Sequence, residues 1–246
     1  MIQFMILGAG PGLPMLDLHL SSVYVNSGGK NILFDCGGGT SHQLLKYQMT
    51  KDYLDAIVIS HYHPDHVSGL LMVLQMLYLE GRTKPLQLFL PERPAAFMDV
   101  LHLFYTFEKR FPYELHVLPV DEIDLYFEDV VAAMTDHLSG YENYIREHQL
   151  LNQMKSFSFR IGTPENSLVY TSDLSDVQCI GALIEGCNTV IIDALHPPAT
   201  SVLSLPDYNV QRIILTHGMS AQLSQMLAEH PDPRFEHAVE GKVYSL

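Results

Sequence analysis

Tryptophan, cysteine and basic side chains are scarce in this sequence. The 246 residues include no Trp, 3 Cys, and 14 Lys plus Arg against 28 Asp plus Glu, for a formal net charge of −14. The three cysteines form no CxxC pair and are too few for a disulfide framework. We therefore expect reduced core side chains at Cys36, Cys179 and Cys187. Because nucleic-acid affinity depends on Lys and Arg that neutralise phosphates, so acidic a chain disfavours extended RNA or DNA as a partner.

The sequence also lacks a long apolar run. The strongest apolar stretch, Gly69–Leu79, is interrupted by Gln75 and is shorter than the roughly 18 residues that a membrane-spanning helix needs. Met1–Phe4 carries no basic residue ahead of its apolar ones, unlike a secretory signal peptide. We therefore expect no membrane association and a cytoplasmic location.

Apolar residues, a class that here includes Ala and Tyr, make up 47% of the chain. They fall into short strand patterns that alternate with helix patterns. Predicted strands cover residues 2–7, 22–25, 31–34, 56–59, 86–90, 115–118, 129–134, 156–161, 167–170, 189–193 and 212–216. Predicted helices cover residues 40–49, 66–80, 95–109, 176–185 and 221–230, the first of them opened by a capping box of Thr40 and Gln43. No linker divides the chain. We expect an α/β fold in one domain, residues 1–246, with two sheets packed together and covered by helices.

One predicted helix is apolar around nearly its whole circumference. Between Phe97 and Phe107 most residues are aromatic or aliphatic. Such a helix is buried on both sides, either in the deep core or in a subunit interface. We expect the interface, and hence a homodimer.

Four ligand-type side chains occur within six residues, directly after the strand predicted at residues 56–59. The segment reads Ser60-His-Tyr-His-Pro-Asp-His66 and places His61, His63, Asp65 and His66 on one loop. Histidine and carboxylate groups at a strand end can project into one cavity and hold more than one metal ion, and a closed zinc shell takes four ligands for each ion. Further ligands must therefore come from elsewhere in the chain.

Three other predicted strands also run into a ligand-type residue. The strand at 129–134 is followed by His137, the strand at 167–170 by Asp173, and the strand at 212–216 by His217. Seven such ligands satisfy two ions about 3.5 to 4 Å apart only if one carboxylate is shared. The pattern therefore predicts a paired metal site.

With these motifs the sequence resembles the metallo-β-lactamase superfamily, in particular its phosphodiesterase branch with ribonuclease Z and the phosphoribosyl cyclic phosphodiesterases. The resemblance rests on Leu7–Pro14 with Ser21-Ser22, Phe34–Thr40, the loop 61–66, His137, Tyr170–Asp173, Asp193–Leu195 and Leu215–His217. It implies an αββα sandwich, two mixed sheets flanked by helices, with a dinuclear metal site.

The resemblance also implies a division of the ligands. His61, His63 and His137 would hold one ion, Asp65, His66 and His217 the other, and Asp173 would bridge both. Zinc is the expected metal, with Mn or Fe as alternatives, because His and Asp suit several divalent ions. A metal-bound water with a pKa near 7 would supply a hydroxide that attacks phosphorus in line.

Other side chains have expected supporting roles. Asp35 either accepts the free ring N–H of a metal-bound histidine or binds loop amides. Gly38, Gly39 and Thr40 at the predicted helix start offer backbone N–H groups to a substrate anion. His196 is the candidate general acid, although the resembling enzymes carry a histidine about one turn later and a loop-capping role is the alternative. Asp65 is expected to share the proton transfer.

The sequence therefore predicts a metal-dependent hydrolase of a small or cyclic phosphodiester. Alternatives are hydrolysis of another ester, lactone or thioester, tRNA 3′ processing, or a metal-binding regulatory module with little turnover. Against tRNA processing, residues 138–155 lack the basic, glycine-rich arm that ribonuclease Z carries after its third motif. Cys36 as a nucleophile is a further alternative to a small core residue.

Overall fold

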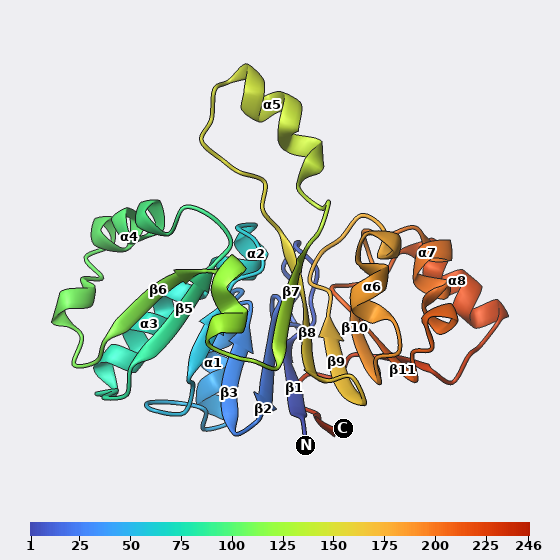
Figure 1. Ribbon diagram of the computed structural model, residues 1–246, viewed down its shortest axis with the longest axis horizontal. Coiled ribbons are helices and arrows are strands. Elements are labelled where there is room, and N and C mark those ends of the chain that lie inside the picture. The colour runs from blue at the N-terminus through green and yellow to red at the C-terminus, as the bar shows by residue number, and fades with distance from the viewer. The chain divides into compact units, whose positions relative to one another are not determined.

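The computed structural model describes residues 1–246, and the chain divides into two compact units, each with one mixed β-sheet (Figure 1). The first unit comprises residues 1, 3–123 and 239–245, and the second comprises residues 2, 124–238 and 246. The expected α/β class with two mixed sheets flanked by helices is confirmed. That residues 1–246 form one domain stays a prediction.

The first unit contains a seven-stranded sheet in the order β13-β1-β2-β3-β4-β5-β6. Its strands are β1 (Gln3–Gly8), β2 (Ser22–Ser27), β3 (Lys30–Phe34), β4 (Ala56–Val58), β5 (Leu86–Leu90), β6 (Leu115–Pro119) and β13 (Val243–Ser245). Neighbours from β13 to β3 run antiparallel, and those from β3 to β6 run parallel. Gly28 and Gly29 join β2 to β3 with φ of 57° and 78°, as a two-residue hairpin turn requires.

Helices of the first unit pack on its sheet through an apolar core. These helices are α1 (Thr40–Lys46), α2 (Pro64–Val67), α3 (Leu70–Leu79) and α4 (Pro94–Leu103), with the 3-10 helices η1 (Glu108–Arg110) and η2 (Val120–Leu125). Fully buried Leu33 and Ile57 of the sheet belong to one cluster with Leu44 of α1 and Leu74 of α3. This packing holds α1 and α3 against the sheet.

The second unit contains a six-stranded sheet in the order β12-β11-β10-β9-β8-β7. Its strands are β7 (Val130–Met134), β8 (Phe157–Thr163), β9 (Asn166–Tyr170), β10 (Thr189–Asp193), β11 (Arg212–Thr216) and β12 (Phe235–His237). The pairs β7–β8 and β8–β9 are antiparallel, and the pairs from β9 to β12 are parallel. The strands β7, β9, β10 and β11 each end at a ligand-type residue or within three residues of one.

Helices of the second unit cover its parallel strands, and one helix stands apart. The helices are η3 (Ser139–Tyr141), α5 (Glu142–Glu147), η4 (Val177–Ile180), α6 (Gly181–Ile184), α7 (Ala199–Leu203), η5 (Leu205–Tyr208) and α8 (Ala221–Glu229). Val190 and Ile213 cluster with Ile184, Val202 and Leu223 from α6, α7 and α8. Between β7 and β8, α5 lies on an arm away from this sheet (Figure 1), and its residues are mostly exposed.

Several sequence predictions of local structure are wrong. The helix predicted at 66–80 is broken between α2 and α3, and the helix predicted at 95–109 ends at Leu103, since Tyr105 has a φ of 59°. The capping box is absent because Gly39 is the N-cap of α1, without a side-chain cap. The Gln43 side chain instead contacts His19 and Glu240.

Burial excludes one alternative and corrects one expectation. Within α4 only Leu101 is buried, so this helix is not deep core. Cys36 and Cys187 are buried core residues, whereas Cys179 is exposed. No helix in the chain is both long and apolar enough to cross a membrane.

Candidate metal centre

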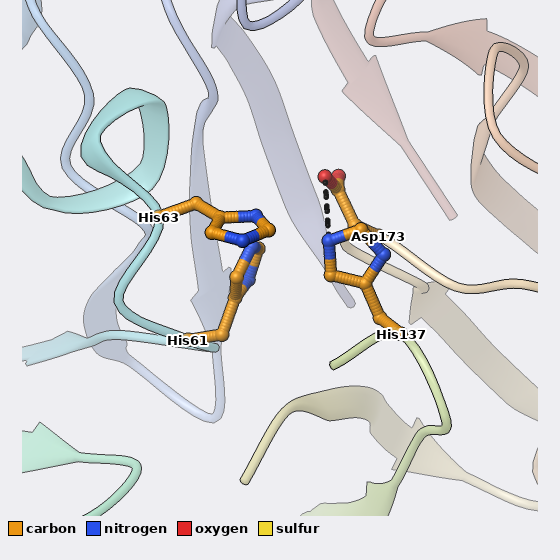
Figure 2. Close-up of side chains that lie close together, drawn as sticks. All are labelled: His61, His63, His137 and Asp173. Carbon is orange, nitrogen blue, oxygen red and sulfur yellow. Dashed lines mark ion pairs between the residues drawn. The ribbon is translucent and has the colours of Figure 1, made fainter. Parts of the chain in front are cut away.

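The first cluster of ligand-type side chains lies on the loop and short helix after β4. His61 and His66 are fully buried, Asp65 is 9% exposed, and His63 is half-buried. Pro64 takes the first position of α2, where its missing N–H costs no hydrogen bond, so Asp65 and His66 fall in the first turn. The rings of His61 and His63 meet edge to face at 4.7 Å between centroids (Figure 2). The structure thus gathers all four predicted ligands of this motif.

Asp35, which follows β3, orients this cluster. Its Oδ2 accepts from Nδ1 of His66 at 2.7 Å and from the hydroxyl of Ser60 at 2.9 Å, and its Oδ1 accepts from the Ser60 amide at 2.8 Å. Asp35 therefore contacts both a ligand-type histidine and a loop amide, and its support of a metal-bound histidine stays a prediction. A ring that donates through Nδ1 presents the lone pair of Nε2, the atom that a metal would bind.

Close backbone packing fixes the position of α2. The Cys36 amide donates to the His66 carbonyl, and the Gly69 amide donates to the Cys36 carbonyl, both at 2.8 Å. A Cβ on Gly37 would lie 2.2 Å from the Asp65 carbonyl oxygen, and one on Gly69 would lie 2.2 Å from the Gly37 carbonyl oxygen. Only glycine permits this approach, so the glycines after β3 serve the placement of Asp65 and His66.

The predicted anion-binding residues lie beside these glycines. Both the amide and the hydroxyl of Thr40 donate to the Gly37 carbonyl, at 3.2 and 2.7 Å. The Gly38 carbonyl accepts from the Leu20 amide at 3.2 Å. The donors of Thr40 are thus used within the loop, and a substrate contact by Gly38, Gly39 and Thr40 stays a prediction.

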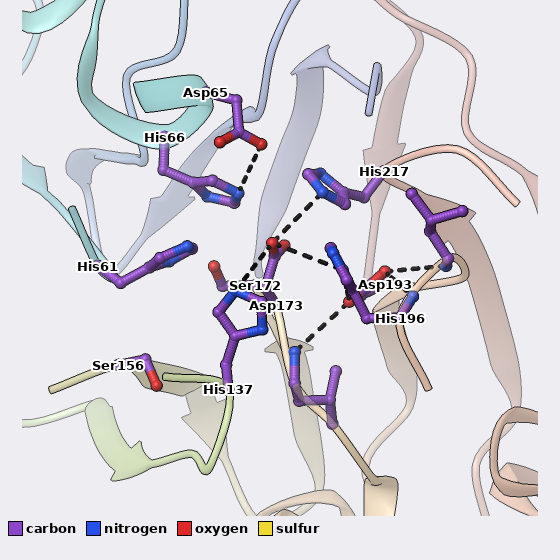
Figure 3. Close-up of polar contacts among 12 residues, drawn as sticks. His61, Asp65, His66, His137, Ser156, Ser172, Asp173, Asp193, His196 and His217 are labelled. Carbon is purple, nitrogen blue, oxygen red and sulfur yellow. Dashed lines mark hydrogen bonds and ion pairs between the residues drawn. The ribbon is translucent and has the colours of Figure 1, made fainter. Parts of the chain in front are cut away.

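The second cluster lies in the other unit, at the ends of β7, β9 and β11. Asp173 and His217 are buried, and His137 is half-buried. Oδ2 of Asp173 lies 3.5 Å from Nε2 of His137 and 3.3 Å from Nε2 of His217 (Figures 2 and 3). His217 has a φ of 61°, a left-handed conformation that turns the chain directly after β11. One carboxylate oxygen thus faces imidazole nitrogens from two other strands.

His196 joins this second cluster through Asp193 at the end of β10. Its Nδ1 lies 2.8 Å from Oδ2 of Asp193 and 3.7 Å from Oδ2 of Asp173 (Figure 3). Oδ1 of Asp193 also accepts from the amides of Leu195 and His196, at 2.9 and 3.2 Å. The imidazole is 38% exposed, so it is both oriented and accessible. Sequence reasoning missed the role of Asp193, although its spacing of three residues from His196 indicated the contact.

The donor chemistry of both clusters fits divalent metals. Each cluster offers imidazole nitrogens and carboxylate oxygens, the ligands that zinc and several other divalent ions take in proteins. The first cluster supplies His61, His63, Asp65 and His66, and the second supplies His137, Asp173 and His217, with Asp193 and His196 adjacent. In each cluster a carboxylate contacts a histidine ring nitrogen, as with Asp35 on His66, so the rings have defined orientations.

Cys36, the alternative nucleophile, is a core residue. Its side chain is fully buried among Leu44, Leu70 and Ile59. Burial raises the pKa of the Cys36 thiol well above its ordinary value. A thiol that stays protonated is a poor nucleophile, and Cys36 therefore belongs to the packing of the first unit.

Comparisons with known proteins extend these observations. A model of the family described as Anti-Pycsar protein Apyc1 matches residues 2–235. A ribonuclease Z of Pseudomonas putida is 37% identical over 141 residues, which cover 56% of this chain and 43% of that protein. A ribonuclease Z of Saccharolobus solfataricus is 26% identical over 269 aligned positions, covering 98% of this chain and 92% of that protein.

The fold is shared with a solved structure. The metallo-β-lactamase-fold protein YhfI of Bacillus subtilis matches with a TM-score of 0.73 at 16% identity. The match covers 99% of this chain and 98% of YhfI. The metallo-β-lactamase fold and the similarity to ribonuclease Z that the motifs predicted are thereby confirmed. The match to the Pseudomonas protein spans less than half of that relative's length.

Proposed function

The chain belongs to the Anti-Pycsar protein Apyc1 family, and on that premise we propose that it is a dinuclear metal-dependent hydrolase of a small or cyclic phosphodiester. The observation that carries the proposal is the position of Asp173, whose Oδ2 lies within 3.5 Å of Nε2 atoms of His137 and His217. A carboxylate so placed suits a ligand shared by two cations.

Seven side chains form the proposed ligand set. His61, His63 and His137 would hold one ion, Asp65, His66 and His217 would hold the other, and Asp173 would be shared. Zinc suits this set, with Mn or Fe as alternatives. When bound, such ions neutralise phosphate charge and lower the pKa of a coordinated water.

Two side chains are proposed to handle protons. The Asp193 carboxylate holds Nδ1 of His196 at 2.8 Å, which leaves Nε2 to donate a proton to the leaving oxygen. Asp65, in the first turn of α2, shares the proton transfer through its carboxylate. Asp35 acts indirectly, by holding Nδ1 of His66.

The chemistry of the substrate is inferred from the relatives and from charge. Two relatives are named ribonuclease Z, and a ribonuclease cleaves phosphodiesters. The net charge of −14 opposes binding of a long phosphate backbone, which favours a small diester.

A direct test measures metal content and turnover together. Purified wild type is expected to carry two equivalents of metal and to hydrolyse bis-p-nitrophenyl phosphate, whereas Asp65→Ala loses turnover. His116→Ala is the matched control, since His116 is 48% exposed and contacts Glu114 outside both clusters. Two equivalents of metal without turnover on any diester or ester would favour the metal-binding regulatory module instead. Hydrolysis of lactones or thioesters but not of phosphodiesters would favour the other ester chemistry.

Processing of tRNA 3′ ends is the second candidate function. It is favoured by the ribonuclease Z of S. solfataricus, whose similarity runs along 98% of this chain. The arm that bears α5 occupies the interval after His137, yet its basic residues Arg146 and Lys155 are balanced by Glu142 and Glu147. Cleavage of a precursor tRNA, compared with small diesters at the same enzyme concentration, decides between the two substrates.

A homodimer in the cytoplasm completes the proposal. Leu103, Phe104 and Tyr105, at and after the end of α4, are 74, 60 and 83% exposed, which supports a subunit contact on this face. Sedimentation at micromolar concentration tests the dimer, and a monomer there would contradict it. Cell fractionation tests the location.

A further inference from the structure

The loop of residues 9–21 between β1 and β2 lies against the first ligand cluster. A Cβ on Gly12 would be 3.2 Å from Oδ2 of Asp65. Pro11 and Pro14 flank this point, and proline restricts backbone freedom. The loop therefore brings a stiff segment of chain beside the carboxylate that the proposed function places on a metal.

Glu240 ties the two ends of this loop together. Its Oε1 accepts from the amides of Ala9 and His19, at 3.0 and 2.8 Å. Its Oε2 lies 2.6 Å from Nδ1 of His19 and 3.1 Å from Nε2 of Gln43. The Glu240 side chain is only 12% exposed, and the adjacent Gly241 amide donates to Ile6 of β1 at 2.9 Å. One carboxylate thus closes the stem of the loop from a residue far away in the sequence.

The tip of the loop is apolar and solvent-facing. Leu13, Met15 and Leu16 are 80, 53 and 104% exposed. Large apolar side chains grouped on an ordered surface indicate a binding site, and ligand pockets are lined mainly by such side chains. The tip is continuous with Asp65 through Gly12, which favours a ligand of that same cluster as its occupant.

We propose that Glu240 is a positioning residue that holds the 9–21 loop beside Asp65, where Leu13, Met15 and Leu16 contact the organic group of the substrate. This inference rests on the proposed function, because it takes the phosphate of the same substrate to lie at the metal ligands. A loop whose stem is closed before binding orders few residues when substrate arrives, which favours affinity.

Because the chain has no Trp, Leu16→Trp introduces the only indole and reports on the tip without turnover. Phenyl phosphate is expected to shift its emission to shorter wavelength, and methyl phosphate is not. In the Leu16→Trp variant, a second substitution of Glu240→Ala should remove this emission shift. Glu240→Gln should retain part of the shift, because its remaining oxygen can still accept hydrogen bonds from both amides.

Turnover gives the second readout. For phenyl p-nitrophenyl phosphate, Leu13→Ser and Leu16→Ser are expected to lower kcat/KM about tenfold through a higher KM. For methyl p-nitrophenyl phosphate, the methyl diester, kcat/KM should change little. Metal content stays unchanged because no ligand is altered. Leu79→Ser is the matched control, as Leu79 is 71% exposed at the end of α3.

Hydrogen exchange reports on the stem directly. Glu240→Ala should speed exchange of the Ala9 and His19 amides, whereas Glu80→Ala, whose carboxylate accepts from the Lys51 amide at 2.9 Å, should leave them unchanged. Unchanged exchange of both amides in Glu240→Ala would overturn the positioning role.

The outcomes separate this inference from the proposed function. Two results together would overturn the inference alone, provided that wild type hydrolyses diesters. The emission of Leu16→Trp would not change with phenyl phosphate, and the ratio of kcat/KM for the phenyl diester to that for the methyl diester would be the same in wild type, Leu13→Ser and Leu16→Ser. An indole shift that follows protein concentration instead of ligand would also overturn it, since a second copy would then cover the tip. A ligand-dependent shift without any hydrolysis would uphold the loop contact and refute the hydrolase.

Discussion

Nδ1 of His66 lies 2.7 Å from Oδ2 of Asp35, and both side chains are fully buried. The two residues follow neighbouring parallel strands, β3 and β4, whose carboxyl ends meet at one edge of the first sheet. This contact turns Nε2 of His66 away from Asp35, so a metal would find a preset ligand there.

Asp35→Asn should weaken zinc binding about 10- to 100-fold, because loss of a carboxylate that orients a ligating histidine has this effect in metal sites. Asn keeps the size of the side chain and tolerates the φ of 57° at this position. Competition with a chromophoric chelator measures the affinity. Asp55→Asn is the control, since Asp55 accepts from the Asn31 amide at the other end of β3. Equal zinc affinity of Asp35→Asn and wild type would refute the orienting role.

Gly37→Ala should lower the free energy of unfolding by about 1 to 3 kcal/mol, the usual range for overpacking. The added Cβ would lie 2.2 Å from the Asp65 carbonyl oxygen, so either the loop or α2 must move. Urea unfolding gives the free energy, and metal content shows whether α2 has shifted. Gly140→Ala, with no atom near its Cβ position, should stay close to wild type.

Asp52 gives a prediction for pH dependence. It accepts from the amides of Lys84 and Thr83 at 2.9 and 2.8 Å, and these bonds lower the pKa of its carboxyl. A lowered folded-state pKa stabilises the fold above the unfolded pKa of about 3.9, and this contribution is lost as pH falls through the folded value.

Asp52→Asn should therefore lower the free energy of unfolding by up to about 1 kcal/mol at pH 7. The effect is small because solvent screens the exposed carboxylate. Below pH 4 the difference from wild type should shrink. Urea unfolding across pH 7 to 3 measures both values, with the exposed Asp99→Asn as control. A difference that grows on acidification would contradict the sign.

The three cysteines should react unequally with iodoacetamide. Burial raises the pKa of the Cys187 thiol to about 12, and burial likewise raises the pKa of Cys36. Cys179 is exposed, although partial burial raises its pKa as well. At pH 8 peptide mass spectrometry should find slow labelling at Cys179 alone. Labelling of Cys36 in the native protein would show that the first unit opens locally.

Local sequence patterns predicted most of the strands and the candidate ligands. A strand shows itself by a short apolar run, and a ligand-type residue directly after it needs only the chain direction to reach the sheet edge. His61, His66, Asp173 and His217 were all predicted in this way. The short strands β12 and β13 were not, because neither has the buried apolar run that marks the equally short β4.

The sequence by itself determined which residues stand at the strand ends, since that follows from periodicity and from motifs a few residues long. Only the tertiary structure decided their partners. Gln43 contacts His19 and Glu240 instead of capping α1, and Glu240 reaches Ala9 from 231 residues away. Such contacts depend on how the chain returns to β1 through β13, and packing across that distance leaves no local signature in the order of residues.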